Sequence, residues 1–167
     1  MQTLESSGWT PGVTQLTDKR VVSKRCSGSK ICVVAALPHI LDSGKAGREE
    51  YLEKVIKGAK KSKNPYLSLM WTEGGAQPAI EEAMGLTFGF PALVAMSVDK
   101  KAYAVHVGSF SVEGIASFLG GLTTGATKTM PFEKLPEIKT VEPWDEQDAK
   151  VVEEEFSLEE LFGDEEL

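Results

Sequence analysis

The stretch from Ile31 to Leu37 is an unbroken apolar run that is rich in β-branched residues. A strand that is apolar on both faces is typical of the interior of a parallel or mixed sheet, where helices cover each side. We therefore expect an α/β protein in which this segment is the central strand.

Helices and a second strand are predicted around this run. Asp18 is a suitable N-cap for a short first helix. From Lys45 to Lys63 apolar residues recur at helical spacing between lysines, which predicts an amphipathic helix that ends at Asn64-Pro65. Tyr66 to Trp71 is then predicted to be a strand parallel to the first, because a helix of this length makes the crossover.

The second half of the domain continues the alternation. Pro78 and Gly85 frame a shorter helix. The apolar run Ala92 to Val98 and the alternating run Ala102 to Val107 are separated by a tight turn and predict an antiparallel pair. Ser111 is the expected N-cap of a last helix. The predicted order is α-β-α-β-α-β-β-α around a mixed sheet of four to five strands.

This order resembles the thioredoxin fold, over residues 14–122, with residues 1–13 as an N-terminal extension. Redox-active members of that fold carry Cys-x-x-Cys directly after the central strand, whereas Pro38 to Ser43 contain no cysteine. Pro91 opens a strand, where the missing amide is tolerated. The resemblance implies that Phe90-Pro91 is a cis peptide bond that faces the former active-site loop.

Four longer runs make the resemblance narrower. They are Cys32 to Asp42, Leu69 to Gln77, Gly89 to Ala92 and Val141 to Asp145. These runs are similar to the last domain of one branch of the protein disulfide isomerase family, which has two redox-active thioredoxin domains, then a non-catalytic one and an acidic tail. The resemblance implies residence in the endoplasmic reticulum lumen, a role in oxidative folding and chaperoning, and catalysis by other domains.

The chain has 167 residues, which is room for one domain and a tail. No apolar run follows the first residues, so we expect no signal peptide here, and no stretch approaches the length of a membrane span. We therefore expect a fragment, an expressed domain or an incomplete gene model, without contacts to a membrane.

Negative charge is concentrated at the C-terminus. Residues 142–167 hold 12 of the 25 acidic residues and one of the 18 basic ones. Residues 123–145 are predicted to be a linker that packs on or near the domain, and self-repulsion predicts a disordered acidic tail over residues 146–167. The final Asp164-Glu165-Glu166-Leu167 resembles the retention signal Lys-Asp-Glu-Leu only in its last two residues.

Two interpretations of the tail stay open. It is a solubilising appendage, or it binds Ca²⁺ weakly, because Ca²⁺ prefers carboxylate oxygens and no EF-hand spacing is present. The candidate calcium ligands are Glu153, Glu154, Glu155, Glu159 and Glu160.

Cys26 and Cys32 are the only cysteines. In an oxidising lumen they are candidates for a structural disulfide that closes a short loop. Two buried inert thiols are a second interpretation, and a regulatory or catalytic pair is a third. The spacing is wrong for Cys-x-x-Cys, which disfavours the third.

The sequence offers no other catalytic group and predicts no cofactor. His39 lies in the former active-site loop and His106 on a strand, and no nucleophile is placed beside either of them by the sequence. Both histidines are interpreted as structural or surface residues. The basic face of Lys24, Arg25, Lys30 and the lysines of the long helix lacks interleaved aromatic residues, so nucleic-acid binding is not expected; a solvated face or docking of the acidic tail remains.

The function predicted from these observations is a non-catalytic binding domain. The cleft that holds substrate in active relatives would engage unfolded clients or a lumenal chaperone, and its candidate residues are Pro38, His39, Ile40, Phe90 and Pro91. Trp71 and Tyr66 are assigned to the core. The alternatives are thiol-disulfide oxidoreductase or isomerase activity, from upstream domains absent here or from the two cysteines, and a purely structural spacer.

Overall fold

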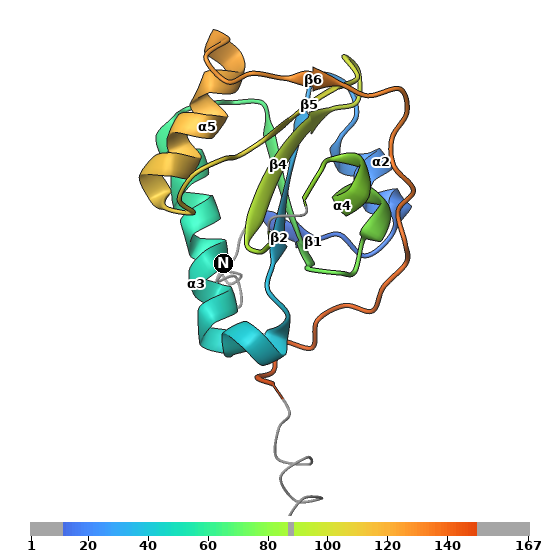
Figure 1. Ribbon diagram of the computed structural model, residues 1–167, viewed down its shortest axis with the longest axis vertical. Helices are drawn as coiled ribbons and strands as arrows, with labels where there is room; N and C mark the ends of the chain where they lie inside the picture. Colours follow the sequence, from blue (N-terminus) through green and yellow to red (C-terminus); the bar gives the residue numbers. More distant parts are fainter. Residues whose placement is uncertain (1–11, 87–88, 150–167) are drawn as a thin grey trace, which may run out of the picture.

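A computed structural model describes residues 12–86 and 89–149 (Figure 1). Its ten elements follow the labels of the figure. In chain order they are β1 (Val13–Gln15), α2 (Lys19–Arg25), β2 (Ile31–Leu37), α3 (Ile40–Ser62), β3 (Leu67–Glu73), α4 (Pro78–Ala83), β4 (Ala92–Ser97), β5 (Ala102–Val105), α5 (Val112–Thr124) and β6 (Met130–Pro131).

The elements form one mixed sheet in the order β1-β3-β2-β4-β5-β6. β2 lies inside the sheet, parallel to β3 and antiparallel to β4, with Ala36 opposite Ala92. From Cys32 to Leu37 every residue of β2 is buried, as the apolar run predicts. The thioredoxin-like α/β fold is therefore confirmed.

The number of strands differs from the prediction of four to five, because the described part of the sheet has six. β1 pairs in parallel with β3, and β6 pairs antiparallel with β5. Both are edge strands of three and two residues, which is too short for a period-two pattern to be recognised.

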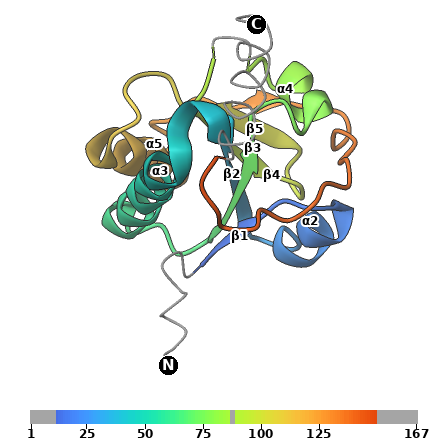
Figure 2. The ribbon, with the colours of Figure 1, turned by 90° about the horizontal axis from the view of Figure 1, so that it is seen from below.

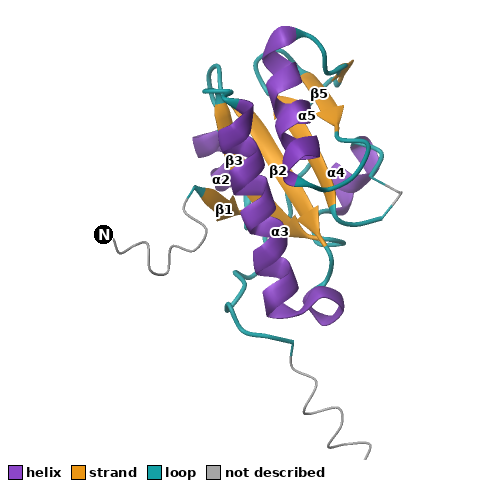
Figure 3. Ribbon diagram, turned by 90° about the vertical axis from the view of Figure 1, so that its left-hand side faces the viewer, coloured by secondary structure: helices purple, strands orange, loops and turns teal. Residues whose placement is uncertain are grey.

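Helices cover both faces of the sheet (Figures 1, 2 and 3). α3 and α5 lie together on one face, and α2 and α4 lie on the other. Two buried clusters result, one on each side of the sheet. Gly58 of α3 allows the close approach of α5, because a Cβ there would lie 2.5 Å from Ile115. The predicted caps are present, since Asp18 accepts from Arg20 N at 2.8 Å and Ser111 from Gly114 N at 3.1 Å.

The segment after β6 runs back across the domain to the beginning of α3 (Figures 1 and 2). The buried side chain of Gln77 exchanges two hydrogen bonds with the backbone of Lys139. Val141 N donates to Thr17 O at 2.8 Å, which holds the segment beside β1. Within the described ranges, no helix is long and apolar enough to cross a membrane.

Candidate functional site

The loop between β2 and α3 corresponds to the redox loop of active thioredoxin folds. His39 caps α3, because its Nδ1 accepts a hydrogen bond from Leu41 N at 3.1 Å. An accepting Nδ1 places the proton of the neutral ring on Nε2. Gly44 has a φ of 71° and separates the first turn from the rest of α3. The loop thus presents a helix N-terminus that carries no thiol.

An ion pair between the buried Arg48 and the partly exposed Glu73 fastens this loop to the sheet. Arg48 is 2% exposed, and its Nη2 donates to Glu73 Oε2 at 2.7 Å and to Pro38 O at 3.2 Å. The same oxygen of Glu73 accepts from Ile40 N at 3.1 Å, and His39 Nε2 lies 3.8 Å from the other oxygen. Charge-assisted bonds of this kind fix geometry strongly. Glu73, at the end of β3, therefore holds the first turn of α3.

Two tryptophans enclose the guanidinium of Arg48. Its Cζ lies 4.9 Å from the ring centre of Trp71 and 5.0 Å from that of Trp144. The two rings are 5.9 Å apart and perpendicular, a favourable edge-to-face arrangement. Trp144 N also donates to Gln15 Oε1 at 2.8 Å. The C-terminal segment therefore completes the surroundings of the buried cation.

The C-terminal segment also contacts the N-terminal part of α3 directly. Lys45 N donates to Asp148 Oδ1 at 2.9 Å. Hydrogen bonds from Lys45 N and then from Ala149 N lower the pKa of the Asp148 carboxyl. The ionised carboxylate is thus the form that binds the helix.

Apolar side chains are exposed at the same end of the sheet. Phe90-Pro91 is a cis peptide bond, as the resemblance implies. The Phe90 ring lies on the backbone of Gly74, where an added Cβ would come within 2.6 Å of it. The exposed fractions are 54% for Leu41, 37% for Phe90 and 85% for Val107, which follows β5. This end of the sheet offers apolar contact area and, among the described residues, no cysteine thiol.

The five predicted binding residues gather at this end of the domain. Pro38 and Ile40 flank His39 at the end of β2, and Pro91 leads into β4, whose Ala92 pairs with Ala36. Their role in peptide binding stays a prediction. Trp71 is buried in the core as expected. The assignment of Tyr66 to the core is wrong: it precedes β3 and is 47% exposed.

Sequence reasoning does not find Arg48 or Glu73. A signal exists in the helical spacing, since Arg48 stands four residues before Leu52 and seven before Val55, both buried. A cation within an apolar helical stripe indicates a buried charge that needs a partner. Nothing in the sequence identifies that partner.

Cys26 and Cys32 form a disulfide at the other end of β2, with their Cα atoms 5.4 Å apart. Both residues are buried. Pro38 lies six residues further along the strand, which corresponds to about 20 Å. The disulfide is therefore remote from the loop that replaces the redox centre.

His106, the second histidine of the chain, is a buried structural residue. Its Nε2 lies 2.9 Å from Ser109 O, and its ring packs near Phe118.

In the part of the chain that the structure describes, no group of three or more His, Cys, Asp or Glu residues could hold a metal ion. The calcium candidates from Glu153 to Glu160 and the last four residues lie outside the described residues, and these interpretations stay predictions.

Comparisons with known proteins agree with this arrangement. A family model described as the PDIA6-like, C-terminal thioredoxin-like domain matches residues 3–127. Protein disulfide isomerase-like 2-3 of rice is 39% identical over 98% of this chain and 38% of that protein. Protein disulfide-isomerase A6 of mouse is 41% identical over 89% of this chain and 34% of that protein. The chain thus spans about a third of the length of these relatives.

Solved structures with the same fold are more distant in sequence. The bb fragment of ERp72 superposes with a TM-score of 0.54 at 16% identity, over 71% of this chain and 51% of that one. The thioredoxin-like domain of Arabidopsis NCP has a TM-score of 0.51 at 9% identity, over 80% of this chain and 94% of that one. At this level of identity the likeness concerns the fold.

Proposed function

Because this chain belongs to the family of PDIA6-like C-terminal thioredoxin-like domains, we propose that it is a non-catalytic domain that binds client or chaperone polypeptides. The loop after β2 carries the proposal. It has no cysteine, and its amide at Ile40 N already donates a hydrogen bond to Glu73. The apolar side chains of Leu41 and Phe90, at the same end of the sheet, are exposed.

The chemistry of this surface suits apolar side chains of an unfolded polypeptide. Leu41 and Phe90 lie at the same end of the sheet, and apolar side chains that form one contiguous exposed patch are typical of an interaction site. The loop that carries Leu41 is fixed by the ion pair between the buried Arg48 and Glu73. Binding to a fixed surface costs little ordering of the protein.

The endoplasmic reticulum lumen is the proposed location. The relatives are named protein disulfide isomerases. A buried disulfide such as Cys26–Cys32 persists in oxidising compartments and is rare in reducing ones. Weak Ca²⁺ binding by the acidic tail belongs to the same proposal, because Ca²⁺ prefers carboxylate oxygens.

Peptide binding tests the proposal. The probe is a short, uncharged, fluorescently labelled peptide rich in Leu and Phe, titrated with the full chain by fluorescence anisotropy. We expect the variant Leu41→Ser to raise Kd by about fivefold, because one exposed Leu contributes on the order of 1 kcal/mol when it is covered. The matched control is Met130→Ser, which removes an equally exposed apolar side chain from β6. Equal effects of both substitutions, or unsaturable binding, would overturn the proposal.

Redox catalysis is the alternative, and the two cysteines give a direct test. We expect no insulin reduction by the full chain and none by the double variant Cys26→Ser/Cys32→Ser, because both sulfurs are buried far from the loop. Turnover that disappears in the double variant would establish a redox function. A purely structural spacer would bind no peptide in the anisotropy titration.

A further inference from the structure

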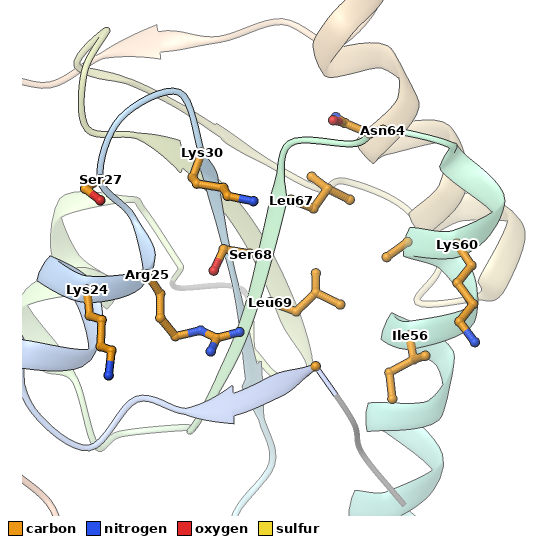
Figure 4. Close-up of a pocket in the computed structure, with 12 residues that line it drawn as sticks. Lys24, Arg25, Ser27, Lys30, Ile56, Lys60, Asn64, Leu67, Ser68 and Leu69 are labelled. Carbon is orange, nitrogen blue, oxygen red and sulfur yellow. The ribbon is translucent and has the colours of Figure 1, made fainter. Parts of the chain in front are cut away.

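A groove of about 760 Å³ lies at the end of the domain opposite the loop of His39 (Figure 4). It crosses the edge of β3 near Leu67, where α2 forms one wall and the C-terminal half of α3 the other. β1 begins at its lower boundary. The groove is therefore separate from the surface proposed to bind clients.

The charge in this groove has one sign. Its lining includes four cations and no carboxylate: Lys24, Arg25, Lys30 and Lys60. Among the described residues none of these four forms a salt bridge. Arg25 Nε is buried and has no hydrogen-bond partner in the same part of the chain. In Figure 4 the side chains of Arg25 and Lys30 extend toward β3. Unpaired cations around a cavity favour an anionic occupant.

The two sides of the groove differ in polarity. Ser68 faces the α2 side with Arg25, whereas Leu67 and Leu69 pack with Ile56 on the α3 side. This follows from the alternation of side chains along β3. An extended peptide alternates in the same way, so one of its faces would meet cations and the other apolar side chains.

Part of the edge of β3 has no partner strand among the described residues. β1 pairs with β3 only from Leu69 onward. Trp71 O accepts a hydrogen bond from Leu16 N, so the peptide groups of Trp71 point to the β1 side. By the same alternation those of Leu67, four residues earlier, point that way and have no strand beside them in the described residues. Such an edge is a place where an extended segment can add.

We propose that this groove binds an extended acidic segment of a partner protein, in which acidic and apolar residues alternate. The carboxylates pair with Arg25 and Lys30, the apolar residues cover Leu67 and Ile56, and the backbone meets the edge of β3 at Leu67. The domain then has two binding surfaces at opposite ends of β2, one apolar and one cationic.

The test uses a fluorescently labelled peptide of alternating Glu and Val and a matched peptide in which Gln replaces Glu. Binding to the full chain is followed by anisotropy at low and high salt. We expect the Gln peptide to bind at least about tenfold more weakly, since two charge-assisted contacts are lost. Added salt should raise Kd for the Glu peptide.

Charge removal locates the site. We expect Arg25→Gln/Lys30→Gln to raise Kd about tenfold, whereas Lys128→Gln/Lys134→Gln, which removes two exposed cations on the segment that follows α5, leaves Kd unchanged. The single variant Lys30→Gln changes only an exposed residue and should give about threefold. Circular dichroism shows whether each variant is folded.

Three results would overturn the proposal. If both double variants raise Kd by the same factor, the peptide is attracted by the overall charge of the domain and not by the groove. Binding that appears only after deletion of residues 150–167 would assign the groove to the chain's own acidic tail. Loss of binding in Leu41→Ser, with the groove variants unaffected, would place the acidic peptide on the client surface.

Discussion

Arg48 Nη2 lies 2.7 Å from Glu73 Oε2, and this contact joins the helix that follows the central strand to the end of the neighbouring strand. In the same place Glu73 accepts from Ile40 N at 3.1 Å. The side chains of Arg48 and Glu73 lie beside the loop after β2, which lacks cysteines. The pair thereby fixes this loop.

Removal of the charge of Glu73 should destabilise the domain. Glu73→Gln leaves the cation of Arg48 buried without its counter-charge, and we expect a loss of about 3 kcal/mol in the free energy of unfolding. Urea unfolding followed by tryptophan fluorescence measures it. The matched control is Glu53→Gln, which breaks an exposed pair with Lys57 at 3.3 Å and should cost less than about 0.5 kcal/mol. Similar losses would contradict the assigned role.

Trp144 should anchor the C-terminal segment. Trp144→Ala removes the ring that covers Arg48 and the edge-to-face contact with Trp71. We expect about 2 kcal/mol lower stability and faster proteolysis after Lys139, because the segment loses its aromatic anchor. Limited trypsin digestion with mass spectrometry identifies the cut. An unchanged cleavage rate at Lys139 would mean that the two hydrogen bonds between the Gln77 side chain and the backbone of Lys139 are enough to hold the segment.

Close contact between Gly74 and Phe90 predicts coupled mutations. Gly74→Ala places a methyl group within 2.6 Å of the Phe90 ring and should cost about 2 kcal/mol. In the double variant Gly74→Ala/Phe90→Ala the conflict is absent, so the cost of the Gly74 substitution should nearly vanish. A thermodynamic cycle from chemical denaturation measures the coupling. Additive losses would show that the ring does not lie on Gly74.

The disulfide should stabilise the fold and should not affect peptide binding at the loop after β2. Closure of a chain segment with a sequence separation of six between Cys26 and Cys32 predicts a loss of about 2 kcal/mol in Cys26→Ala/Cys32→Ala. Thermal unfolding measures this loss. Binding of the uncharged Leu- and Phe-rich peptide should be unchanged at temperatures where the variant is folded, and weaker binding there would contradict the separation of the two sites.

The Asp18 cap predicts a dependence on pH. Hydrogen bonds from the Arg20 side chain, and then from its backbone, lower the pKa of the Asp18 carboxyl. A lowered folded-state pKa contributes stability above the unfolded value of about 3.9 and loses it as pH falls through the folded value. Wild type should therefore exceed Asp18→Asn in stability near neutral pH, and the difference should shrink below about pH 4. Urea midpoints at both pH values measure it; a constant difference would exclude the charge as its source.

Much of the fold can be predicted from short stretches of the sequence. The apolar run of β2 is readable within seven residues, and the caps Asp18 and Ser111 mark where helices begin. The lack of cysteine after β2 is read directly from the residues, and the cis bond at Pro91 is implied by the resemblance to the thioredoxin fold. The short edge strands β1 and β6 cannot be predicted in this way, because they have too few residues for a recognisable pattern and exist only through their hydrogen bonds to β3 and β5.

The amino-acid order alone thus establishes the α/β alternation, the central strand and the loss of the redox motif, because each depends on residues close together in the chain. The enclosure of Arg48 by Glu73, Trp71 and Trp144 depends on folding, since it joins α3, β3 and the C-terminal segment. The groove beside Arg25 and Lys30 also depends on folding, because α2, the beginning of β3 and the C-terminal half of α3 form it together. Long-range contacts leave no periodicity in the sequence, so only the packed elements bring these charges together.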